Sequence, residues 1–186
     1  MHLIAGTDKD NIVRELIVDN EGHLIAMEYL HNKVHDGEML YVTKVYTAVA
    51  NNATVYIRHV SGPTKYLHSE VICETIGQWE FNSYSGTTYT VAGTVIPIIN
   101  RKSDSTYVPE VVFRHTPTIN VLGTPRLNFV FGGGTNPSNS SSGSFQERLE
   151  SIFAPNADIL VGVTNQSGSA QYITFTYNFY EEKMEV

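Results

Sequence analysis

The feature that most constrains this chain is an alternation of apolar and polar residues with a period of two. The clearest case is residues 171–180, where large apolar side chains fall on one face and mostly hydroxyl and amide groups fall on the other. The apolar face consists of Ile173, Phe175, Tyr177 and Phe179. This period matches a half-buried β-strand and not a helix, which would need a period of 3.6.

Further strands are predicted from the same alternation and from runs of Val, Ile, Thr and Tyr. They cover residues 38–50, 54–60, 126–131 and 158–163. Turn-forming Gly, Pro, Asn and Ser separate the runs. These turns fall at residues 50–53, 61–63, 85–86, 92–93 and 165–169, and the first is a hairpin candidate. Roughly nine to eleven short strands at this spacing predict an all-β sandwich or barrel.

Two segments are less regular. Residues 145–153 fit either a helix or a strand, and their β-rich neighbours favour a strand. Residues 132–144 (GGGTNPSNSSSGS) form a low-complexity stretch that lacks apolar side chains for a core. We expect that stretch to be a flexible surface loop at one end of the sandwich.

The first 36 residues differ from the rest, because they carry more charge and only short apolar pieces. A turn is predicted at residues 19–22 (DNEG). We therefore expect two parts: an N-terminal arm or hairpin over residues 1–36, which contacts a neighbouring protein, and a β-sandwich over residues 37–186.

The composition excludes several classes of partner. The net charge is −7, from 12 Lys and Arg against 19 Asp and Glu, whereas binding to nucleic acid or anionic lipid requires clustered Lys and Arg. Charged residues make up 17% of the 186 residues, below the roughly 25% of ordinary soluble domains, and Ser, Thr and Asn take their place. No apolar run reaches the length of a membrane helix and no signal peptide is apparent, so we expect synthesis in a cytoplasm.

The candidates for chemistry are few. The single cysteine, Cys73, lies in an apolar run and is interpreted as a buried structural thiol. His31 and His35 are four residues apart, which on a helix would form one edge of a metal site, but on a strand would separate the two side chains by about 13 Å. Because strands dominate, both histidines are interpreted as part of a turn that continues through Asp36 and Gly37. No metal is predicted.

The other candidates also favour structural roles. His59 and His68 flank a turn and are expected to form exposed cross-strand contacts, and His115 is expected to end a strand. Trp79, with nearby tyrosines, would suit stacking on a sugar, although a core position for Trp79 is the simpler interpretation. No nucleophile, base and oxyanion-stabilising group can be assembled from the sequence, so an enzyme is not predicted. No catalytic or cofactor-binding residue is assigned, and no cofactor is expected.

Six short motifs in order along residues 28–181 carry a family resemblance. They are residues 28–37 (EYLHNKVHDG), 97–102 (PIINRK), 115–117 (HTP), 153–157 (FAPNA), 163–165 (VTN) and 179–181 (FYE). In this order they resemble the capsid decoration proteins of tailed bacteriophages, which stabilise the head from outside.

The resemblance implies a jelly-roll-like antiparallel β-sandwich, frequently assembled as a trimer. It also implies a non-enzymatic virion protein on the outer capsid surface, with the major capsid protein as partner and synthesis in a bacterial cytoplasm. The alternative is a head-fibre or tail-associated adhesin with a carbohydrate-binding β-sandwich. We expect neither nucleic acid nor a membrane as a partner.

Overall fold

The computed structural model describes residues 4–7, 13–16, 29–131, 142–146 and 151–183. Within these residues the chain forms sixteen β-strands and one short helix. The predicted all-β sandwich is confirmed. The predicted number of strands was too low, because the alternation cannot be recognised in strands of only two to four residues.

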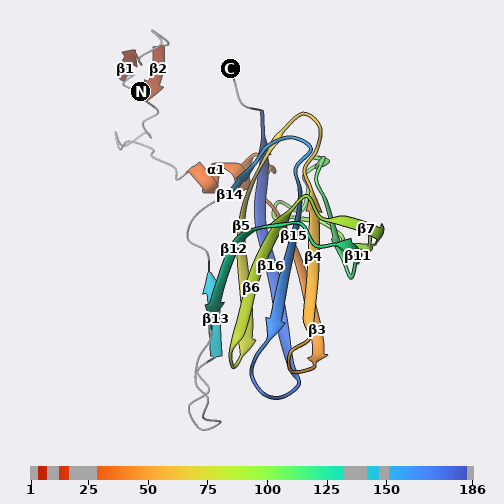
Figure 1. Cartoon of the computed structure of the whole chain (residues 1–186). Helices are drawn as coiled ribbons and strands as arrows, with labels where there is room; N and C mark the ends of the chain where they lie inside the picture. Colours follow the sequence, from red (N-terminus) through yellow and green to blue (C-terminus); the bar gives the residue numbers. More distant parts are fainter. Residues whose placement is uncertain (1–3, 8–12, 17–28, 132–141, 147–150, 184–186) are drawn as a thin grey trace.

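Two sheets pack face to face and form the body of the molecule (Figure 1). The first, called here the β16 sheet, has the order β13-β5-β16-β3-β9, and β14 also pairs with β5. Its strands are β3 (Leu40–Val49), β5 (Tyr66–Ile76), β9 (Ile99–Asn100), β13 (Ser142–Gln146), β14 (Ser151–Phe153) and β16 (Gln171–Glu182). All the pairings in this sheet are antiparallel.

The second sheet, called the β15 sheet, has the order β12-β6-β15-β4-β10-β8 and is also antiparallel throughout. Its strands are β4 (Thr54–Val60), β6 (Trp79–Ser85), β8 (Thr94–Val95), β10 (Val112–His115), β12 (Thr124–Phe131) and β15 (Asp158–Asn165). Strands β7 (Thr88–Val91) and β11 (Thr118–Val121) form a separate two-stranded ribbon, which projects to the right in Figure 1. In the arm, β1 (Ile4–Thr7) pairs with β2 (Val13–Leu16).

The core lies between the two sheets and consists of the apolar faces that the alternation predicted. From Ile173 to Phe179 every second residue of β16 is fully buried, and alternate residues of the facing β15 are buried as well. The buried residues are Ile173, Phe175, Tyr177 and Phe179 on β16, and Ile159, Val161 and Val163 on β15. Burial of these large side chains is the main driving force for packing the sheets together, at roughly 1.5–3 kcal/mol for each.

The chain passes between the sheets at almost every turn. β3, β5 and β16 lie in one sheet, whereas β4, β6 and β15 lie in the other. The turn at residues 50–53 forms as predicted, with Asn52 at a φ of 63° and the Ala53 N–H donating to the Ala50 carbonyl. However, β3 and β4 belong to different sheets, so the hairpin prediction for this turn was wrong. A turn signal identifies a reversal of the chain but not whether the two strands pair.

Two other predictions need correction. Residues 142–144, predicted as the end of the flexible loop, belong to β13 and pair with β5, because strand pairing compensates for their low apolar content. The last strand extends past Tyr180 to Glu182. The rest of the predicted loop, residues 132–141, and the turn predicted at residues 19–22 lie outside the described residues.

Candidate functional site

The exposed apolar side chains gather on the segment that joins β6 to β12. We call residues 86–123 the β6–β12 connection; it contains β7 to β11. Twelve large apolar residues of the described part of the chain are exposed. Six of them lie in this connection: Val91, Val95, Ile99, Val108, Val121 and Leu122. These six lie on β7, β8, β9 and β11 and in the loops next to them, so the connection is our candidate for protein contacts.

A charged cluster attaches the projecting ribbon to the β15 sheet. Arg58 on β4 donates two hydrogen bonds to Asp158 on β15, at 2.9 and 2.6 Å. The Tyr89 hydroxyl on β7 donates to the same carboxylate at 3.4 Å, and the Arg58 guanidinium lies 4.1 Å from the centre of the Tyr89 ring. Hydrogen bonding to Asp158 raises the pKa of Arg58, and burial raises the pKa of Tyr89 to about 12. The cluster therefore stays charged at Arg58 and neutral at Tyr89 at physiological pH.

A second attachment lies at the end of β16, where Glu181 is only 4% exposed. Its carboxylate accepts hydrogen bonds from the backbone N–H groups of Glu110 and Val111, the shortest at 2.7 Å. The Tyr107 hydroxyl also donates to it, at 2.9 Å. Glu181 is therefore a buried acceptor that holds the β6–β12 connection against the sandwich.

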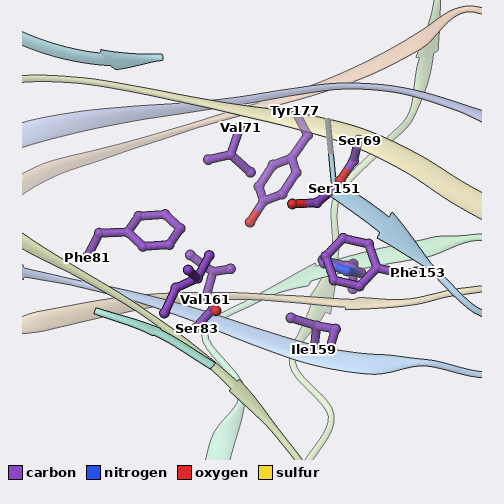
Figure 2. A pocket seen from close by; sticks show the side chains of 11 residues that line it. Ser69, Val71, Phe81, Ser83, Ser151, Phe153, Ile159, Val161 and Tyr177 are labelled. Atoms are coloured by element: carbon purple, nitrogen blue, oxygen red, sulfur yellow. The ribbon is translucent and has the colours of Figure 1, made fainter. Parts of the chain in front are cut away.

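A small cavity lies between the two sheets, next to His59 (Figure 2). Its volume is about 20 Å³, and the Tyr177 hydroxyl points into it. The polar side chains in its lining are His59, Ser69, Ser83, Ser151 and Tyr177. A polar cavity of this volume accommodates one water molecule, the usual partner of buried polar groups in such places. It has no room for a sugar or another organic ligand.

His59 itself is 1% exposed and packs edge-on against Phe153 at 4.7 Å between ring centres. Neither of its ring nitrogens has a hydrogen-bond partner among the described protein groups. Burial lowers the pKa of His59 to about 4, partly opposed by Asp158. The imidazole is therefore neutral at physiological pH, because the loss of hydration disfavours its charged form more than the Asp158 carboxylate favours it.

The predicted exposed contact between His59 and His68 was wrong. His59 lies on β4 and His68 on β5, in different sheets, and His68 stacks on Tyr180 instead. The sequence did contain a signal for the burial of His59. Because residues two apart share a face of a strand, His59 shares the face of Val55 and Ile57.

The interpretation of His31 and His35 as part of an extended turn was also wrong, because residues Tyr29–His35 form helix α1. Both side chains are exposed. On the helix, four residues make just over one turn, so the two rings lie on the same face. The two Nε2 atoms are 3.0 Å apart. The turn itself forms directly after the helix, with Gly37 at a φ of 73°.

Three further residues take the structural positions that the sequence predicted. Cys73 is fully buried, and burial raises the pKa of its thiol, so the reactive thiolate is disfavoured. His115 is the last residue of β10. Trp79 is also fully buried, and its indole N–H donates to the Ile76 carbonyl at 3.1 Å. Trp79 is therefore unavailable as a stacking surface for a sugar.

In the part of the chain that the structure describes, no group of three or more His, Cys, Asp or Glu side chains is arranged to hold a metal ion. No helix among those residues combines the length and apolar character needed to cross a membrane. Comparisons with protein-family models, with curated proteins and with solved structures found no match to this chain.

Proposed function

We propose that this protein is a non-enzymatic structural component of a tailed-phage virion that binds the outside of the capsid and stabilises it, as a trimer. The observation that carries an interaction role is the concentration of exposed apolar side chains on the β6–β12 connection, where half of the exposed large apolar residues of the described chain lie. Such side chains make favourable contacts when another subunit covers them. Within that class, the capsid as partner is suggested by the resemblance of residues 28–181.

The strand order supports the jelly-roll fold that the resemblance implies. A jelly roll has eight main strands in two four-stranded sheets. Four strands of one sheet, β3-β16-β5-β13, face four of the other, β4-β15-β6-β12. Successive main strands alternate between the sheets except from β6 to β12, which pair within one sheet. This is the connectivity of a folded antiparallel ribbon, and we infer a jelly roll with the β6–β12 connection as its largest insertion.

The way the connection is attached also suits a docking surface. The ribbon of β7 and β11 projects from the sandwich (Figure 1), yet it is tied to the β15 sheet through Tyr89, Arg58 and Asp158. A two-stranded ribbon alone is marginally stable in water. Attachment to a rigid sandwich orders the surface before binding, so less conformational entropy is lost in the complex.

Binding to capsids is the decisive test. Phage heads assembled without this protein are mixed with the purified chain, and the particles are imaged by electron microscopy. We expect added density on the outer surface and a higher melting temperature of the heads, because a ligand of the assembled state stabilises that state. Heads that already carry the protein serve as the control and should take up none.

Failure to bind bare heads would overturn the proposal. In that case, binding to a glycan array would favour the adhesin alternative. The fully buried Trp79 removes the strongest sugar-binding candidate in the sequence, so we expect no binding to the array.

The role of the arm is tested separately. We propose that residues 1–36 contact the capsid or a neighbouring subunit, so deletion of residues 1–27 should weaken binding to bare heads. This deletion leaves α1 and the sandwich intact in sequence. Undiminished binding by the shortened chain would contradict a contact made by the arm. It would still support binding of the protein to the capsid.

A further inference from the structure

We infer that His31 and His35 form a bidentate site for a divalent transition-metal ion on helix α1. The two Nε2 atoms are 3.0 Å apart. Two metal–nitrogen bonds of about 2.0–2.1 Å that meet at about 90–109° place their nitrogens about 2.8–3.4 Å apart. The observed separation therefore fits one ion held by both rings, without movement of the backbone.

The spacing is the one that helical metal sites use. Histidines at positions i and i+4 lie on one face of a helix and bind zinc together in metalloproteases. Here residue 32 is Asn, where that motif has the glutamate that acts as general base. The pair therefore has the spacing for metal binding but lacks the general base that hydrolysis would require.

The helix that carries the pair is held in place. The Lys33 ammonium lies 2.7 Å from Glu38 and 3.6 Å from Glu182 at the end of β16, and 5.4 Å from the centre of the Tyr180 ring. After α1 the chain reverses, and the Glu38 N–H donates to the Lys33 carbonyl at 2.9 Å. These contacts order the short helix before any ion binds, which reduces the entropic cost of chelation.

The two rings are accessible to an ion. Both are exposed, and His31 borders an open hollow of about 270 Å³ that Glu70 and Arg101 also line. With two protein ligands, the remaining coordination positions fall to water. Imidazole pairs favour Cu²⁺, Ni²⁺ and Zn²⁺, whereas Mg²⁺ and Ca²⁺ require oxygen ligands.

Binding requires one change of tautomer. In the metal-free pair, one ring donates its Nε2–H to the other Nε2, since two neutral rings 3.0 Å apart form a hydrogen bond. A metal needs the lone pair of both Nε2 atoms, so the donor ring must carry its proton on Nδ1 instead. The proton moves from one nitrogen to the other within that ring, through solvent.

The test is titration of the full chain with Zn²⁺, Cu²⁺ and Mg²⁺ by calorimetry. We expect one ion per chain, tighter binding of Cu²⁺ than of Zn²⁺, and no binding of Mg²⁺. The electron paramagnetic resonance spectrum of the Cu²⁺ form should show two nitrogen ligands. Loss of a residue that only hydrogen-bonds to a metal ligand lowers metal affinity about 10–100-fold. Loss of a direct ligand should cost no less, so His31→Ala and His35→Ala should each weaken Zn²⁺ binding at least about tenfold.

A matched control keeps the composition and changes only the geometry. The double variant His35→Asp/Asp36→His retains all the residues but moves the second histidine off the shared face, and it should lose the bidentate site. His115→Gln should bind as the wild type does. Circular dichroism confirms that each variant folds. Unchanged Zn²⁺ affinity in His31→Ala or in the double variant, or fewer than one ion per chain, would overturn the site.

Discussion

At the scale of single residues, His59 shows how a polar side chain comes to lie in an apolar core. Its backbone position on β4 directs the ring inward, toward Phe113, Phe153 and Tyr177. The protein then stabilises the ring only in its neutral form, because the cavity beside it offers hydroxyl groups and no counter-charge. A group of this kind makes stability depend on pH.

We predict that His59 lowers stability in acid. Its folded pKa of about 4 lies below its ordinary value of about 6.5, so the unfolded chain binds more protons between these two values. The contribution of His59 to the unfolding free energy is therefore greatest above pH 6.5 and falls by about 3 kcal/mol as the pH decreases to 4. Denaturant unfolding of the wild type and of His59→Met at pH 7 and pH 4 measures this contribution.

The comparison at two pH values separates packing from protonation. The difference between the two proteins at pH 7 reports packing and hydration of the neutral ring. Between pH 7 and pH 4, this difference in unfolding free energy should shift by about 3 kcal/mol in favour of the His59→Met variant. Parallel loss of stability in both proteins would show that other groups cause the acid sensitivity.

At the scale of elements, the end of β16 serves both the sheet and the β6–β12 connection. We predict that Glu181→Gln lowers the unfolding free energy by about 1–3 kcal/mol. The two backbone N–H groups donate to the carboxylate, and the Gln side chain would place an N–H donor opposite one of them. Urea denaturation measures the effect. Glu182→Gln is the matched control: its side chain is 40% exposed, and its long 3.6 Å ion pair with Lys33, partly open to solvent, is worth at most about 1 kcal/mol. Equal effects at the two positions would contradict the buried-acceptor role of Glu181.

The long strands could be predicted from sequence, and α1 could not. β4 was predicted with its observed bounds, Thr54–Val60, and β16 with its buried face, because alternation is directly visible over seven or more residues. α1 has seven residues, fewer than two turns, which is too short to show a period of 3.6. Its histidines were therefore assigned by analogy with the surrounding strands.

At the scale of the whole molecule, the exposed apolar surface should govern self-association. We predict a trimer of about 62 kDa, three times the chain mass of 20.7 kDa, in sedimentation experiments. If the β6–β12 connection forms the contacts, Val91→Ser/Val121→Ser should shift the population toward the monomer, since apolar burial drives association. Val45→Ser, an exposed position on the β16 sheet, is the control. A monomer at all concentrations would contradict the trimer.

The sequence by itself determined which residues lie on the buried faces of β4, β15 and β16, because side chains alternate between the two faces of any strand as a property of the backbone. On β12 the same rule placed Leu127 inward, whereas it is 43% exposed. The buried face of β16 follows from that rule, whereas the burial of Cys73 was predicted from its apolar run. Only the tertiary structure decided which strands pair, and therefore which distant residues meet. Asp158 binds Arg58 across a hundred residues, and Glu181 binds the backbone at residues 110 and 111. These contacts depend on sheet order, which local periodicity does not specify.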